Sequence, residues 1–144
     1  MISRELAGRL SDRLTWKPAN GDLFFIPRPE ISDSVFLVSD MVVELIVRDG
    51  QRRFHFNGTV EWALDSVEVG EVVWLPREDQ LRDLIGDRFV SLDRTGDGYL
   101  VTLSGPPRAF HTPAQPSAAD AYAIALLHLL DQDPSAVPDR STER

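Results

Sequence analysis

The stretch MVVELIVRDGQRRFHFN, residues 41–57, decides much of the fold because one dipeptide within it fixes how two strands pair. Asp49-Gly50 is the strongest short-range signal for a two-residue hairpin turn, and apolar or alternating segments lie on both sides of it. Such a turn sets the register, so we expect Glu44 opposite His55. One face of the hairpin is then apolar and the other mostly polar, as in an antiparallel sheet that is solvated on one side.

Helices are predicted on both sides of this hairpin. Ser3 is expected to cap a first helix, and Pro76 to open a second one. Ser117 and Asp120 have the spacing of a capping box and start a third helix, over residues 117–130. This last segment is apolar nearly all round, so we expect it to be buried.

The other segments favour strands and turns. Strands are expected at residues 23–26, 35–39 and 72–75, with a second hairpin over residues 89–103. A proline-rich loop is expected at residues 104–116. Residues 59–67 stay open between a short helix capped by Thr59 and irregular structure.

These elements predict an α+β fold with a mostly antiparallel sheet, an N-terminal helix, a middle helix and a buried C-terminal helix. A chain of 144 residues has the length of one domain, which we expect over residues 1–130. Residues 131–144 are polar and contain prolines, which predicts a disordered tail.

The composition argues against several classes of protein. There is no cysteine, which excludes disulfides, thiol nucleophiles and cysteine zinc sites. Acidic residues number 23 against 15 basic ones, and the net charge of −8 opposes binding to nucleic acid phosphates. The longest apolar run, residues 121–130, is too short to cross a bilayer, and the first residues lack the apolar core of a signal peptide. We therefore expect a soluble cytoplasmic protein that binds neither nucleic acid nor membrane.

A possible calcium loop lies at residues 93–100, DRTGDGYL. Asp93, Asp97 and Gly98 match positions 1, 5 and 6 of an EF-hand loop, but position 12 is Ser104, which cannot supply a bidentate carboxylate. The sequence predicts a hairpin tip instead, with Gly96 and Gly98 at positive φ, and no metal site.

Nucleotide and catalytic motifs are absent from the sequence. It contains no GxxxxGK[ST] or GxGxxG phosphate loop, no GxSxG nucleophile elbow and no HExxH zinc motif. We therefore expect no nucleotide, no cofactor and no metal.

Four side chains are the candidates for a binding site. His55 lies on the polar hairpin face, where it either pairs with Glu44 across the strands or serves in a site. Glu61 and Asp65 are four residues apart, which fits a solvated face or a site for an arginine, a cation or a ligand amine. Trp62 lies beside Glu61 and is interpreted as a packing residue or a ligand platform.

Four strings carry a resemblance to a known group of proteins: SRELAGRL, FNGTVEWALDSV, WLPREDQLRDLIGDRF and AYAIALLHLL. Together they cover much of residues 2–130 and resemble a family of short, uncharacterised actinobacterial proteins that are often labelled pilus assembly proteins. The resemblance implies an intracellular actinobacterial protein and transfers no functional residue to this chain.

Two functions from different classes remain open. The acidic charge, the small size and the lack of catalytic motifs favour a non-enzymatic protein that binds or modulates a protein partner with a basic surface. The alternative is a small enzyme or ligand-binding domain with a cleft near His55, Glu61 and Asp65. A deep pocket that holds two of these side chains would favour the alternative, and a flat polar surface would favour partner binding.

Overall fold

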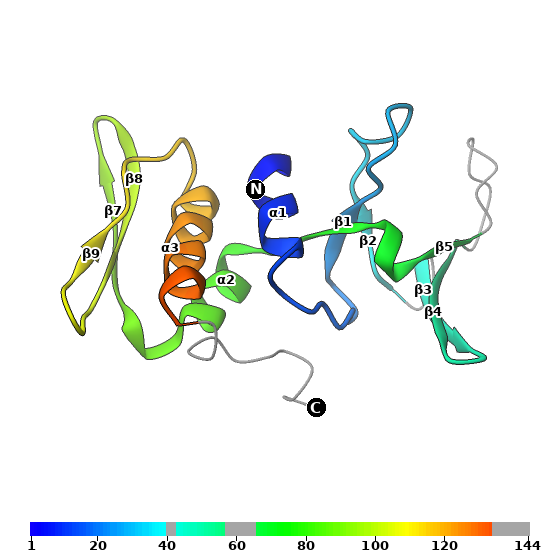
Figure 1. The fold of residues 1–144 in the computed structure, drawn as a ribbon. Coiled ribbons are helices and arrows are strands. Elements are labelled where there is room, and N and C mark those ends of the chain that lie inside the picture. The colour runs from blue at the N-terminus through cyan, green and yellow to red at the C-terminus, as the bar shows by residue number, and fades with distance from the viewer. Residues whose placement is uncertain (40–42, 57–65, 134–144) are drawn as a thin grey trace. The chain divides into compact units, whose positions relative to one another are not determined.

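The computed structural model describes residues 1–39, 43–56 and 66–133, and this part of the chain holds three α-helices and three small antiparallel sheets (Figure 1). The predicted α+β class, with N-terminal, middle and C-terminal helices, is confirmed. The chain divides into two compact units: unit 1 contains residues 1–15 and 76–144, and unit 2 contains residues 16–75. A single domain over residues 1–130 stays a prediction, and each unit is described by itself.

Unit 2 contains two three-stranded sheets. Its strands are β1 (Leu23–Phe25), β2 (Phe36–Leu37), β3 (Val43–Arg48), β4 (Gln51–Phe56), β5 (Ser66–Glu68) and β6 (Val73–Leu75), with a 3-10 turn η1 (Val69–Glu71) before β6. The sheet orders are β2-β1-β6 and β3-β4-β5, and every pairing is antiparallel. For residues 59–67 the sequence left a short helix and irregular structure as alternatives. Strand β5 includes the last two of these residues, and residues 59–65 lie outside the described residues.

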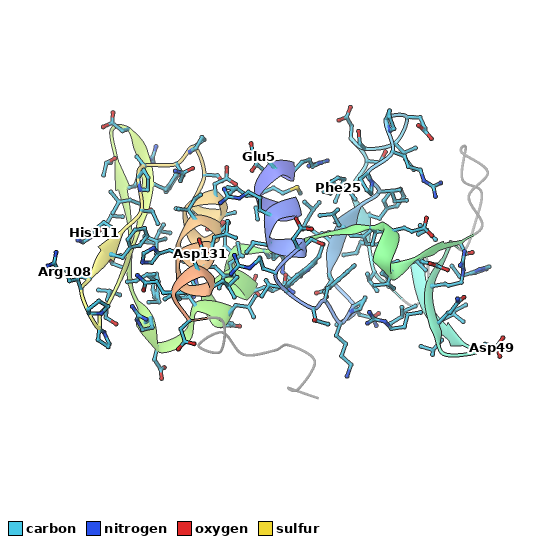
Figure 2. The ribbon with its side chains drawn as sticks, in the orientation of Figure 1. Glu5, Phe25, Asp49, Arg108, His111 and Asp131 are labelled. Carbon is cyan, nitrogen blue, oxygen red and sulfur yellow. The ribbon has the colours of Figure 1, made fainter. Side chains whose placement is uncertain are left out.

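The β3–β4 hairpin has the predicted register. Glu44 lies opposite His55, and the pairing continues to Arg48 opposite Gln51. Asp49, labelled at the tip in Figure 2, has φ 51°, and Gly50 has φ 78°. Two successive residues at positive φ are typical of the type I′ turn, whose twist matches that of the flanking strands.

An aromatic cluster forms the core of unit 2. Phe54 of β4 stacks on Phe24 of β1 with ring centroids 4.5 Å apart, which joins the two sheets. Trp16 lies 5.6 Å from Phe54 and stacks on Trp74 of β6 at 6.0 Å. The buried carboxylate of Asp22 accepts a hydrogen bond of 3.0 Å from the Trp16 indole N–H, which fixes this ring.

Unit 1 combines three helices with one sheet. Its elements are α1 (Arg4–Ser11), α2 (Glu78–Ile85), a 3-10 turn η2 (Gly86–Arg88), β7 (Phe89–Thr95), β8 (Gly98–Leu103), β9 (Phe110–His111) and α3 (Ala118–Gln132). The sheet order is β7-β8-β9. Strand β9 lies inside the segment that was predicted to be a proline-rich loop. The predicted tail begins inside α3, and residues 134–144 lie outside the described residues.

Helix α3 is the buried centre of unit 1, as its apolar sequence predicts. Its Ser117 hydroxyl accepts a hydrogen bond from the backbone N–H of Asp120 at 3.1 Å, which confirms the predicted N-cap. The Asp120 carboxylate does not close a capping box, because it accepts a hydrogen bond of 2.8 Å from the backbone N–H of Ser3. Ser3 is the predicted N-cap of α1, so one carboxylate links the starts of two helices.

The β7–β8 hairpin places the acidic segment at a turn, as predicted. Thr95 pairs with Gly98, so Gly96 and Asp97 form the tip. Gly98 has φ 131°, but Gly96 does not have a positive φ, so the expectation of two such glycines was half wrong. The absence of a calcium site stays a prediction.

No helix in the described part of the chain combines the length and hydropathy that a bilayer crossing requires.

Candidate functional site

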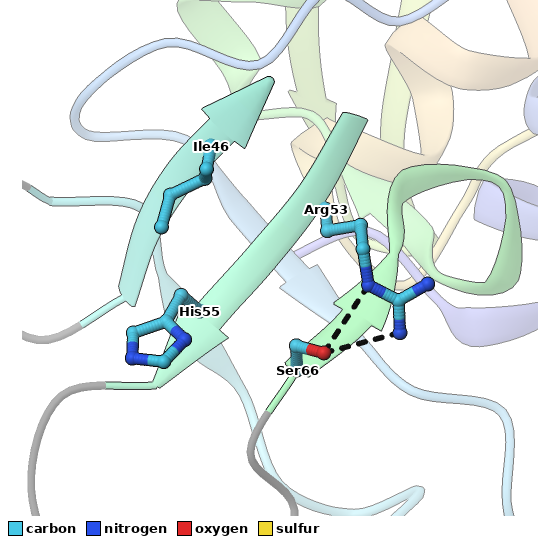
Figure 3. A pocket seen from close by; sticks show the side chains of 4 residues that line it. All are labelled: Ile46, Arg53, His55 and Ser66. Carbon is cyan, nitrogen blue, oxygen red and sulfur yellow. Dashed lines mark hydrogen bonds between the residues drawn. The ribbon is translucent and has the colours of Figure 1, made fainter. Parts of the chain in front are cut away.

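A small surface hollow lies on the β3-β4-β5 sheet of unit 2 (Figure 3). Its volume is about 240 Å³, and its lining comprises Ile46, Arg53, His55 and Ser66. These residues come from three neighbouring strands. The hollow therefore forms only when the strands are paired in the observed register.

The register brings the four lining residues to the same face of the sheet. Ile46 of β3 lies opposite Arg53 of β4, and Arg53 lies opposite Glu68 of β5. In the next row of that face, His55 lies opposite Ser66. Alternate residues point to opposite faces of a strand, so these two rows form one surface, called the polar face below.

The other face of the same sheet contributes to the aromatic core. Phe54 and Val67 lie opposite each other between the two polar rows, and both are buried. This division explains why the hairpin sequence alternates between apolar and polar residues on β4. The core holds the strands in place, and the polar face is left to solvent.

Arg53 is the most constrained side chain of the polar face. Its Nε and Nη2 donate hydrogen bonds of 3.2 and 3.1 Å to the Ser66 hydroxyl oxygen, as Figure 3 shows. Its Nη1 donates to a Glu68 carboxylate oxygen at 3.0 Å. The guanidinium is thus held in one orientation although the side chain is 40% exposed. A fixed, half-exposed guanidinium loses little conformational entropy when a partner packs against it.

The described hollow combines hydrogen-bonding side chains with an apolar surface. The Ser66 hydroxyl oxygen accepts hydrogen bonds from the Arg53 guanidinium, a cation that cannot act as a general base. His55 is exposed and can accept or donate hydrogen bonds. Ile46 adds an apolar surface beside these polar groups.

The structure places one of the four predicted site residues. His55 lines the hollow, whereas Glu61, Trp62 and Asp65 lie outside the described residues. Ile46 and Arg53 were missed, although the predicted register already placed both on the face of His55. The contribution of Ser66 had no signal in the sequence, because its strand was not predicted.

The other two histidines have structural contacts in unit 1. His128 of α3 stacks on the ring of Phe110 at 3.6 Å. The His111 Nδ1 lies 2.9 Å from the Thr102 hydroxyl on the neighbouring strand. Within the described ranges, no three His, Asp or Glu side chains are grouped as metal ligands would be.

Comparisons with known proteins identify no relative. No family model matches the chain, and no curated protein or solved structure matches it. The resemblance to short actinobacterial proteins therefore stays a prediction.

Proposed function

We propose that this protein is a non-enzymatic module that binds a protein partner with a basic surface through the polar face of the β3-β4-β5 sheet. The observation that carries the proposal is the fixed Arg53, which two side chains of β5 hold at a half-exposed surface beside His55 and Ile46. A mixed surface of arginine, histidine and isoleucine is suited to contact with another protein.

The size of the hollow supports a protein partner over a small ligand. Pockets that enclose small molecules have volumes of about 300–1,000 Å³. The hollow on the polar face has about 240 Å³. A hollow of this size can receive one side chain of a partner, while the surrounding strands supply the rest of the contact.

The charge of unit 2 supports the basic character of the partner. Residues 16–75 contain ten acidic and five basic residues, so unit 2 has a net charge of −5. The positive charge of Arg53 is offset by Glu68, which is 43% exposed. A field of this sign accelerates encounter with a positively charged protein and opposes binding to nucleic acid. We propose the cytoplasm as the place of this interaction, in line with the expectation from the sequence.

The test is affinity capture with a charge-reversed polar face. The immobilised full-length chain is incubated with lysate of an actinobacterial host, and the retained proteins are identified by mass spectrometry. Glu68→Lys should remove a retained basic protein, because it reverses a charge on the polar face and releases Arg53. Asp97→Lys makes the same change in charge at the exposed β7–β8 tip of unit 1 and should retain it.

The outcomes separate the proposal from its alternative. A partner lost with Glu68→Lys and with His55→Ala, but kept with Asp97→Lys, supports the proposal. A partner kept by all variants would contradict it. The alternative, a small enzyme or ligand site near His55, Glu61 and Asp65, is supported by a small metabolite whose thermal stabilisation of the protein is lost with His55→Ala.

A further inference from the structure

We propose that the hollow on the polar face binds a carboxylate group, and that an acidic side chain of the protein partner supplies it. This inference rests on the proposed function, because it names the group of the partner that enters the hollow. It follows from the hydrogen-bond donors and acceptors that the described lining has left to offer. Donors are in excess there, and an ionised carboxylate only accepts hydrogen bonds.

Arg53 has more donors than the described residues use. A guanidinium has five N–H groups and no acceptor. Arg53 forms three hydrogen bonds, two to Ser66 and one to Glu68, so two of the five N–H groups have no acceptor among the described residues. Because the guanidinium is fixed and half-exposed, these two groups are available to a ligand that enters the hollow.

Ser66 is left with a donor and not with an acceptor. A serine hydroxyl has two lone pairs and one O–H group. Nε and Nη2 of Arg53 both donate to the Ser66 oxygen, which uses its two lone pairs (Figure 3). The O–H group donates to no acceptor in the described part of the chain, so it is available to the hollow that Ser66 lines.

His55 and Ile46 complete the described lining. His55 lies opposite Ser66, and its exposed imidazole has at least one N–H donor whether it is neutral or protonated. Ile46 contributes an apolar surface. A carboxylate on a short aliphatic stem, as in aspartate or glutamate, matches both the donors and the apolar contact.

The charges beside the hollow favour a carboxylate over a phosphate. Arg53 is the one described arginine of the lining, and its Nη1 is bound to the Glu68 carboxylate at 3.0 Å. Glu68 lies opposite Arg53, in the row that does not contain His55 and Ser66. Its negative charge opposes a second anion nearby, and it opposes a phosphate dianion about twice as strongly as a carboxylate.

A carboxylate in the hollow narrows the surface that the partner must have. Unit 2 has ten acidic and five basic residues, so the contact around the hollow favours a basic surface. The hollow adds the requirement for one acidic side chain within that surface. A basic protein without it would leave donors of Arg53 and Ser66 unpaired, at a cost in affinity. The hollow therefore separates the partner from basic proteins in general.

A similar pair of side chains in unit 1 lacks this excess of donors. Thr102 lies opposite His111 on neighbouring strands, as Ser66 lies opposite His55. The Thr102 hydroxyl and His111 Nδ1 are 2.9 Å apart, so they satisfy each other. His111 therefore serves as a control within the same molecule.

The test is a titration of the full-length chain with small probes, followed through the imidazole C–H signals in proton NMR spectra. The chain has three histidines, and His55→Gln identifies the signal of His55. The probes are propionate, propionamide, propylammonium and inorganic phosphate, each up to about 200 mM at matched pH and ionic strength. We expect propionate to shift the His55 signal with saturation and to leave those of His111 and His128 unchanged.

Variants of the lining assign the effect to the hollow. Arg53→Gln should weaken propionate binding by about tenfold or more, because it removes hydrogen bonds between charged groups. Ser66→Ala should also weaken it, and Ser66→Thr, which keeps the hydroxyl, should restore it. Arg94→Gln removes an exposed arginine of unit 1 and should leave propionate binding unchanged.

Two results would overturn the inference. One is a propionate effect that Arg53→Gln does not weaken. The other is a His55 signal that no probe shifts, or that propionamide, propylammonium or phosphate shifts at lower concentration than propionate.

The result is also separate from that of the capture experiment. If propionate does not bind but a basic protein is still captured and lost with Glu68→Lys, the carboxylate site is wrong and the proposed function stands. If propionate binds and no basic protein is captured, the carboxylate site stands and the proposed function is wrong.

Discussion

The two hairpins of this protein use the same short connection but are held in different ways. The β3–β4 turn contains Asp49 and Gly50, both at positive φ, and space is open around Gly50. At the β7–β8 turn the positive φ belongs to Gly98, whose Cα lies against the backbone of Gln115. Tyr99 and Gln115 also exchange backbone hydrogen bonds of 2.9 and 2.7 Å beside this turn.

The difference shows that one hairpin depends on local conformation and the other on a distant contact. A substitution at the β3–β4 turn changes only the conformational preference of the turn. At the β7–β8 turn, the same kind of substitution must also displace another segment of the backbone. We therefore expect glycine substitutions at the two turns to differ in cost by a few kcal/mol.

The largest effect is expected for Gly98→Ala. A side chain at φ 131° is strained, and its Cβ would overlap the carbonyl oxygen of Gln115. We expect a loss of about 3 kcal/mol or more in the free energy of unfolding, measured by urea titration with circular dichroism. Gly96→Ala is the matched control, because nothing lies within 4 Å of its added Cβ. Equal losses at the two glycines would contradict the role of the Gln115 contact.

Thr112→Val tests the support of β8 from the segment that follows β9. The buried backbone N–H of Val101 donates a hydrogen bond of 2.9 Å to the Thr112 hydroxyl. Valine keeps the shape but leaves this donor without an acceptor, so we expect a loss of about 2 kcal/mol by the same titration. Thr112→Ser keeps the hydroxyl and should cost less. If serine cost as much as valine, packing and not this hydrogen bond would stabilise the strand.

A smaller effect is expected for Gly50→Ala. The position has φ 78° but open space around its Cα, so only the backbone strain of an alanine at positive φ remains. We expect a loss of about 1 kcal/mol in the stability of unit 2. Hydrogen exchange of the β3 and β4 amides would measure it. A loss as large as that of Gly98→Ala would remove the distinction between the hairpins.

Calcium should have no specific effect on the β7–β8 tip. Asp93 accepts a hydrogen bond from the Ser91 hydroxyl at 2.8 Å, and the Asp97 backbone N–H donates to the Thr95 hydroxyl at 3.2 Å. These local contacts are those of a turn. We expect the same melting temperature in calcium and in magnesium at matched ionic strength. A rise of several degrees with calcium alone, lost with Asp97→Ala, would contradict this expectation.

The fold was predictable from the sequence where a local signal was sufficient. The Asp49-Gly50 turn fixed the pairing of β3 with β4 down to individual residues. Ser3 and Ser117 marked the starts of α1 and α3. Strand β9 was not predictable, because it consists of Phe110 and His111 and depends on pairing with β8.

The candidate site was predictable only as far as the hairpin reached. The register placed Ile46 and Arg53 on the face of His55, but it gave no reason to select them. Arg53 is fixed by Ser66 and Glu68. Both belong to strand β5, which follows β4 in the sequence after an interval of nine residues. No two-residue turn fixes the register between β4 and β5, so the structure was needed to find their pairing.

The two units of the chain differ in which fluorescent side chains they contain. All three tryptophans, at positions 16, 62 and 74, lie within residues 16–75, and both tyrosines, at positions 99 and 122, lie in unit 1. Fluorescence excited at about 295 nm selects indole over phenol, so it reports on unit 2 alone. Because Trp16 and Trp74 stack at 6.0 Å in the core, their emission should shift to longer wavelength when that core opens. The unlabelled protein thus contains a native reporter that separates the unfolding of one unit from that of the other.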